Sequence, residues 1–230
     1  PTPDPERQPD LVASAVQRSQ SEVPGYRLQD IEGWDVYVSR KLLRDDKVAT
    51  NRAVQLMRVQ LRTIANRVPA HALDFFRTVP LWVSPQYEGT GPKAEYHPGA
   101  GWLREHGRDL QMAKAVEFTN VDIFEKECER MPLFVLHELA HAYHDQVLGY
   151  DDPALKAAWE RAKAGGKYEA VENHAGKTMR AYGMNNPQEY FAESTEAFFG
   201  RNDFYPFDAE QLEAHDPDMF ALLERIWRRP

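Results

Sequence analysis

The sequence predicts an α+β fold, in which a short twisted sheet packs on one buried helix and a mostly helical half follows. Three observations support this class. Short stretches with strand-like alternation lie in the first half of the chain, apolar residues at helical spacing dominate the second half, and a very apolar helical stretch joins the two. With 230 residues, the chain is long enough to bury a core. We expect one domain over residues 25–230, after an extended, proline-rich lead-in over residues 1–24 that includes a loose helix at 11–16.

The first half contains the predicted strands. Residues 34–39, Trp-Asp-Val-Tyr-Val-Ser, alternate and are rich in β-branched and aromatic side chains. Strands at 80–84 and 115–119 are predicted on the same grounds, and apolar residues at helical spacing predict an amphipathic helix at 47–68. Residues 89–101 are rich in glycine and proline, and their centre at 93–97 is either an edge strand of the sheet or an ordinary surface loop.

The second half is predicted to be mostly helical. The apolar helix covers residues 130–148, with Pro132 near its first turn and Gly149 just past its end. Three further helices are expected at 153–164, at 187–199 and from Asp216 onward, the second of them opening with a proline and ending at a glycine. Residues 167–186 should begin as helix and then turn at Gly183.

Composition excludes several classes of partner. The chain has 36 acidic and 28 basic residues and a formal charge of -8, which argues against nucleic acid and against an anionic membrane surface. No apolar stretch approaches the length of a membrane span. Cys128 is the only cysteine, so no intrachain disulfide can form, and we expect it to be a packed residue rather than a nucleophile. We expect a monomer.

The start of the chain does not decide its compartment. It begins at Pro1, and removal of a signal peptide or trimming of the sequence would both produce this start. The localisation therefore stays open, with a secreted or extracytoplasmic location as the favoured expectation.

The apolar helix carries the motif that points to chemistry, His137-Glu138-Leu-Ala-His141. Histidines four apart on a helix project about 40° from each other, so both imidazoles can bind one metal ion. Glu138 lies beside that face, where a carboxylate can accept a proton from a metal-activated water. The motif therefore predicts a catalytic zinc site with Glu138 as general base.

A catalytic zinc needs a third protein ligand. His144 lies roughly 10 Å along the axis from His137, which is too far for both to bind one ion. We therefore expect His144 either to support a metal ligand from behind or to lie on the helix surface. Glu189 and Glu193 stand one turn apart on an otherwise apolar helix, where carboxylates are costly unless positive charge holds them. We expect Glu189 to bind the metal and Glu193 to accept a hydrogen bond from a ligand histidine, with Glu196 on the solvated face.

The two motifs together resemble the catalytic domain of the anthrax lethal factor family, which includes Pro-Pro endopeptidases. The likeness covers His137-Glu-Leu-Ala-His141 and the later Tyr182-Gly followed by Asn186-Pro-Gln-Glu189-Tyr-Phe-Ala-Glu193. It implies a zincin-like, gluzincin-type fold, Glu189 as the third zinc ligand and Tyr182 as a residue that assists the oxyanion. The chain departs from the family in the Ser-Thr pair that follows Glu193, and its first half does not align, so substrate preference is not implied.

These residues predict a Zn²⁺-dependent metalloendopeptidase acting on a peptide or protein substrate. Two other readings stay open: a non-catalytic, zinc-dependent binding or sensory module, and a non-haem iron enzyme with two histidines and one carboxylate. An intact Glu138 argues against the first, and the acid directly after the first histidine argues against the second. Two roles also stay open: Tyr182 could be a packed tyrosine, and His174 is expected on the surface although it could assist the oxyanion instead.

Overall fold

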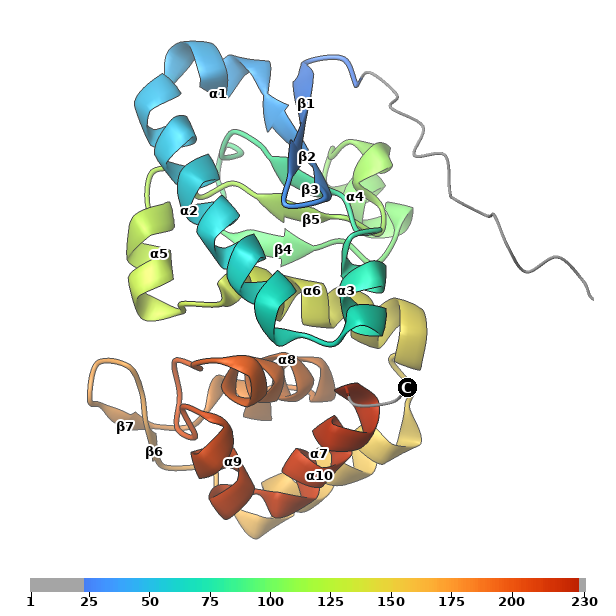
Figure 1. Cartoon of the computed structure of the whole chain (residues 1–230), viewed down its shortest axis with the longest axis vertical. Coiled ribbons are helices and arrows are strands. Elements are labelled where there is room, and N and C mark those ends of the chain that lie inside the picture. The colour runs from blue at the N-terminus through green and yellow to red at the C-terminus, as the bar shows by residue number, and fades with distance from the viewer. Residues whose placement is uncertain (1–22, 228–230) are drawn as a thin grey trace, which may run out of the picture.

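The computed structural model describes residues 23–227, and these form a mixed α+β structure. Its sheet has five strands in the order β1-β2-β3-β5-β4. Their bounds are β1 Tyr26–Ile31, β2 Trp34–Ser39, β3 Leu81–Val83, β4 Ala94–Tyr96 and β5 Val116–Phe118. The three central strands are parallel, whereas β1 and β4 run antiparallel to their neighbours at the two edges. Figure 1 shows this sheet in one half of the molecule and a layer of helices in the other, which confirms the α+β class.

The strand β1 was not expected from the sequence, because its residues lack a clear alternation. In the structure only one of them is fully buried. It forms a hairpin with β2 through a two-residue turn at Glu32 and Gly33, whose φ angles are 55° and 92°. Positive φ at both positions fits a tight hairpin turn with the twist of the strands. Pairing with β2, and not its own pattern, makes this segment a strand.

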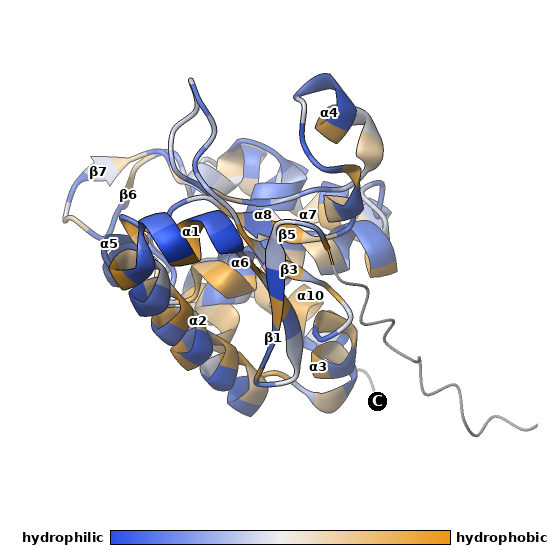
Figure 2. Ribbon diagram, turned by 90° about the horizontal axis from the view of Figure 1, so that it is seen from above, coloured by the Kyte–Doolittle hydropathy of each residue, from blue (hydrophilic) through white to orange (hydrophobic). Residues whose placement is uncertain are grey.

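The sheet is covered on one face by two helices. α2 (Lys47–Arg67) turns its apolar residues into the core cluster that the strands share, and α6 (Phe134–Tyr143) lies beside β4 and β5. Figure 2 shows α6 coloured largely as hydrophobic, whereas α2 alternates between the two colours. The polar face of α2 is paired as a solvated face would be: Arg52 contacts Glu125, and Arg62 binds Glu32 at 2.8 Å.

The helix α6 is shorter than the predicted 130–148 stretch. A separate helix, α5 (Phe124–Arg130), comes before it, and extended backbone at Met131 divides the two. After Tyr143 the helix continues as a π-helical turn, His144–Leu148. This turn ends at Gly149, whose φ is 83°. Five short helical segments were also not predicted: α1 Arg40–Asp45, α3 Ala70–Phe76, α4 Ala100–Glu105, the 3-10 turn η1 Leu110–Met112 and α9 Ala209–His215.

The helical layer packs under α6. It consists of α7 (Pro153–Gly165), α8 (Pro187–Phe199), α9 (Ala209–His215) and α10 (Pro217–Trp227). α8 lies directly against α6, and α10 contacts both α7 and α8. The buried apolar cluster is continuous from Ile31 on the sheet to Trp227 in the last helix.

The prediction of a helix at the start of residues 167–186 is wrong. That stretch contains a small hairpin, β6 (Val171–Glu172) with β7 (Thr178–Met179), and then the 3-10 turn η3 (Tyr182–Met184). The Asn173 side chain accepts hydrogen bonds from the backbone N–H groups of Ala175 and Lys177, and these bonds stabilise the turn. Such local side-chain bonds compete with helix formation.

Two other expectations concern the ends and the surface of the chain. The lead-in over residues 1–24 and its helix at 11–16 lie almost wholly outside the described residues, apart from Val23, which is buried, and Pro24. Within residues 23–227, no helix combines the length and the apolar character that crossing a bilayer requires. Cys128 is half-buried and accepts a hydrogen bond from Gln60 at 3.2 Å, and burial raises its pKa, as expected for a packed thiol.

Candidate metal centre and active site

The helix α6 presents His137 and His141 on one face, toward α8. His137 is buried and His141 half-buried, and their rings lie edge to face at 4.8 Å between centroids. α6 is fixed because apolar side chains on its other faces pack into the core, among them Phe134, Leu136 and Leu139. The local sequence therefore sets the spacing of the two imidazoles, and packing sets their direction.

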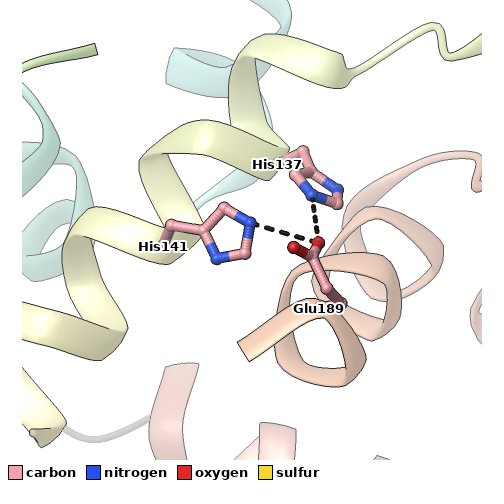
Figure 3. A group of neighbouring side chains, drawn as sticks. All are labelled: His137, His141 and Glu189. Atoms are coloured by element: carbon pink, nitrogen blue, oxygen red, sulfur yellow. Dashed lines mark hydrogen bonds and ion pairs between the residues drawn. The ribbon is translucent and has the colours of Figure 1, made fainter. Parts of the chain in front are cut away.

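The first turn of α8 brings Glu189 to the same point. Pro187 begins this helix, and the Asn186 side chain caps it by accepting a hydrogen bond from the Glu189 backbone N–H at 2.8 Å. The Glu189 Oε2 atom lies 3.1 Å from His137 Nε2 and 3.3 Å from His141 Nε2 (Figure 3). The three predicted ligands thus meet, although Glu189 follows His137 by 52 residues.

The spacing of these three atoms fits a zinc ion. Ligand atoms bound tetrahedrally at about 2.1 Å lie roughly 3.4 Å from one another. The two observed separations, 3.1 and 3.3 Å, come close to this value. Burial opposes ionisation of Glu189, yet hydrogen bonds with the two histidines outweigh it and hold the pKa of the carboxyl far below its ordinary value. A carboxylate and two imidazoles are a donor set that zinc accepts, with one corner left for solvent.

Glu138 lies next to this triad and is held by the edge of the sheet. Its Oε2 atom accepts a hydrogen bond from the backbone N–H of Tyr96 on β4 at 2.9 Å. The carboxylate therefore has a fixed position between β4 and the histidines. This is where a general base for the predicted reaction would have to be.

The support for His137 differs from the prediction. The sequence suggested Glu193 as the hydrogen-bond partner of a ligand histidine and placed Glu196 on the solvated face. The structure gives this bond to Glu196, whose Oε1 atom lies 2.8 Å from His137 Nδ1 and whose side chain is completely buried. Burial raises the pKa of Glu196 to about 7, and the bond with His137 acts in the opposite direction.

The geometry of α8 explains this difference. Glu189 and Glu196 are seven residues apart, so they share one face of the helix about 10 Å from each other. The His137 ring lies along that face and contacts Glu189 with one nitrogen and Glu196 with the other. Glu193 points beside the ring and accepts a hydrogen bond from Asn202 Nδ2 at 3.0 Å. The sequence did contain a signal for Glu196, its i, i+7 spacing from Glu189. The closer i, i+4 pair of Glu189 and Glu193 was chosen instead.

Burial without a matching cation also shifts the pKa of Glu193. Desolvation, followed by the nearby charges of Asp203 and Glu196, raises the pKa of Glu193 well above its ordinary value. The His137 ring is buried, and although burial favours its neutral form, the bonds with Glu189 and Glu196 raise its pKa. Several carboxylates thus crowd around one imidazole, which is the electrostatic environment that favours a bound cation.

The other predicted residues have mixed outcomes. Tyr182 lies in η3 beside the site with 47% of its surface exposed, so it is not a packed tyrosine. His174 is exposed on the β6–β7 hairpin, as expected. His144 is neither in the second shell nor on the surface: it is fully buried, with Tyr150 and Phe191 at 5.2 and 5.3 Å between ring centroids. Burial lowers its pKa to about 4, so it packs as a neutral ring.

A cleft passes over the centre and consists of two pockets. The pockets share the wall made by Lys93, Ala94, His137, Glu138 and Tyr182. One, of about 480 Å³, extends toward the start of α6, and we call it the Arg130 pocket. The other, of about 560 Å³, extends toward the end of α6, and we call it the Tyr150 pocket. The cleft gives room for substrate on both sides of Glu138.

Comparison with known proteins gives one match. Residues 125–228 match the family model described as glucose-regulated metallo-peptidase M90. The matched range contains both histidines, Glu138, Tyr182 and Glu189, and it supports a metallopeptidase of the hydrolase class that uses a metal ion. No curated protein and no solved structure matches the chain. The finer resemblance to the lethal factor family remains a prediction.

Proposed function

We propose that this protein is a zinc-dependent metalloendopeptidase of the gluzincin type, on a zincin-like fold. The observation that carries the proposal is the convergence of His137 Nε2, His141 Nε2 and Glu189 Oε2, at 3.1 and 3.3 Å, beside the carboxylate of Glu138. When bound there, Zn²⁺ would lower the pKa of a water to about 7 and polarise the carbonyl of the scissile bond.

The side chains around the metal would handle the protons and the developing charge. Glu138 accepts a proton from the attacking water and then delivers it to the leaving amine. Its bond to the Tyr96 N–H keeps one oxygen engaged at 2.9 Å and leaves the other for this transfer. Tyr182, half-exposed in the wall of the cleft, donates a hydrogen bond to the oxyanion. Glu196 holds the His137 ring so that Nε2 faces Glu189, the position from which it would bind the metal.

The edge strand β4 would align the substrate. The residues just before and just after β4 bond backbone to backbone toward β5. The carbonyl of Lys93 accepts a hydrogen bond from the Thr119 N–H, and the His97 N–H donates one to the carbonyl of Ala115. Alternation along an antiparallel ladder then directs the N–H and C=O of Ala94 away from β5. An extended peptide can pair with this free edge, so that its backbone passes over Glu138.

Metal analysis and peptide cleavage together test the proposal. We expect one zinc per chain, and we expect the wild type to cut peptides from a proteome-derived pool internally, as mapped by mass spectrometry. Glu138→Gln should retain zinc and lose cleavage by a factor of about 10² to 10⁴. Zinc without cleavage in the wild type would contradict the proposal and favour a binding module, whereas iron with oxygen consumption would favour an oxygenase.

A further inference from the structure

We propose that the Arg130 pocket selects a lysine or arginine side chain at the residue that directly follows the scissile bond. This inference rests on the proposed peptidase function and adds the substrate class. It depends on three features of the described residues: the direction of β4, the apolar walls of the pocket, and an excess of buried carboxylates at its inner end.

The direction of β4 decides which part of a substrate enters the pocket. Lys93 and Ala94, at the start of the strand, line both pockets. Pro92, just before them, lines the Arg130 pocket alone, whereas Glu95, Tyr96 and Pro98 line the Tyr150 pocket alone. A peptide paired antiparallel with this edge, the more frequent arrangement, runs in the opposite direction. Its residues after the scissile bond therefore lie over the Arg130 pocket.

The walls of the pocket suit a long aliphatic stem. Apolar side chains come from three segments: Met131 and Phe134 just before and at the start of α6, Met179 on β7, and Phe204 in the loop after α8. The volume of about 480 Å³ is sufficient for any side chain. Lysine and arginine bury their methylene groups along such surfaces and carry the charge at the tip.

The inner end of the pocket is acidic. Glu193 is 5% exposed and Asp203 2% exposed, and both line the pocket. Asp203 Oδ1 is buried without a hydrogen-bond partner among the residues that the structure describes. A buried carboxylate without enough positive charge near it is costly, and an arriving cation would relieve that cost.

The basic side chains that line the pocket are already paired. Arg130 contacts Asp203 through Nη1 and Glu127 through Nη2, both at 2.6 Å. Lys93 binds Glu95 at 2.8 Å. Glu127, Glu193 and Asp203 thus line the same pocket as Arg130, so an acidic substrate residue would meet like charges, and a basic one would meet the surplus carboxylates.

Matched peptides test the inference. Two peptides differ only at the residue after the scissile bond, with lysine in one and norleucine, which lacks the ammonium, in the other. We expect the wild type to cleave the lysine peptide with a kcat/KM at least about tenfold higher. Asp203→Asn and Glu193→Gln should each reduce this ratio to within about threefold, because each removes one of the unmatched carboxylates. Asp151→Asn, an equal charge change on an exposed residue outside the pocket, should leave the ratio as it is.

Binding to an inactive variant gives a second readout. Glu138→Gln should bind the lysine peptide about tenfold more tightly than the norleucine peptide, and a glutamate peptide more weakly than both. If Asp203→Asn does not fold, because Asp203 pairs with Arg130, the ratio in Glu193→Gln decides.

Four results would overturn the inference. Equal cleavage of the lysine and norleucine peptides would refute the selection of basic residues by the buried carboxylates. An unchanged ratio in a folded Glu193→Gln variant would do the same, and both results would leave the proposed peptidase function standing. Preference for the glutamate peptide would instead assign substrate recognition to Arg130. Failure to cleave any peptide in the pool, by a wild type that contains zinc, would refute the proposed function together with this inference.

Discussion

Replacement of Glu196 should weaken zinc binding without removing any ligand. Its carboxylate lies 2.8 Å from His137 Nδ1 in a completely buried site, so the bond is charge-assisted and free of competition from water. Hydrogen bonds to charged groups contribute about 1.5–3 kcal/mol, which corresponds to about 10- to 100-fold in affinity. Outer residues that orient ligand histidines have effects of this size.

The two replacements of Glu196 should differ in a defined order. Glutamine keeps an oxygen that can still accept a hydrogen bond from Nδ1–H, so Glu196→Gln should lose about tenfold in zinc affinity. Alanine leaves the buried nitrogen without a partner, so Glu196→Ala should lose about 100-fold. Competition with a chromophoric chelator at fixed pH measures both values.

The matched control is Glu193→Gln. This residue is the one that the sequence suggested for the role, yet its bond is with Asn202 and not with the His137 ring. Its zinc affinity should therefore stay within about threefold of the wild type. A larger loss in Glu193→Gln than in Glu196→Gln would refute the reasoning and restore the assignment made from the sequence.

Three further predictions concern single side chains. Tyr182→Phe should lower kcat by about 10²–10³ with little change in KM, measured on a cleaved peptide, because only the oxyanion contact is lost. The pKa of His144 is lowered to about 4 from 6.5, so its contribution to stability is present above pH 6.5 and is lost as pH falls toward 4. Urea titrations of the chelator-treated protein at pH 7 and pH 4 should show wild type losing about 3 kcal/mol more than His144→Phe. Gly200→Ala should lower the free energy of unfolding by about 1–3 kcal/mol, because the new Cβ would overlap the buried Leu133 side chain, and an unchanged melting temperature would contradict this.

The convergence of His137, His141 and Glu189 could be predicted because each part of it follows from features close together in the sequence. One helical turn separates His137 from His141, and this alone puts both rings on one face. Glu189 was recognisable because a carboxylate in apolar company needs a positive partner. The distance between the two helices did not need to be known, since a single ion defines a common point for all three side chains.

The support of the site could not be predicted in the same way. The choice between Glu193 and Glu196 depends on how α8 crosses α6, because both lie near the face that carries Glu189. Crossing geometry comes from the packing of residues far apart in the chain, and spacing within α8 does not contain it. The strand β1 and the β6–β7 hairpin were missed for a similar reason: pairing with a neighbour and a turn at Asn173 decide their conformation.

The acidic surroundings of His137 connect the metal site with the Arg130 pocket. Glu193 and Glu196 come from one helix, Asp203 from the loop after it, and Arg130 from the end of α5. Asp203 influences the pKa of both glutamates, and Arg130 offsets part of this negative charge. A cation that enters the pocket would therefore stabilise the ionised form of the same cluster that holds His137 in place. If the proposal for the pocket is correct, a basic substrate residue should strengthen the hydrogen bond from His137 to Glu196, so recognition of the substrate and orientation of the ligand depend on one set of charges.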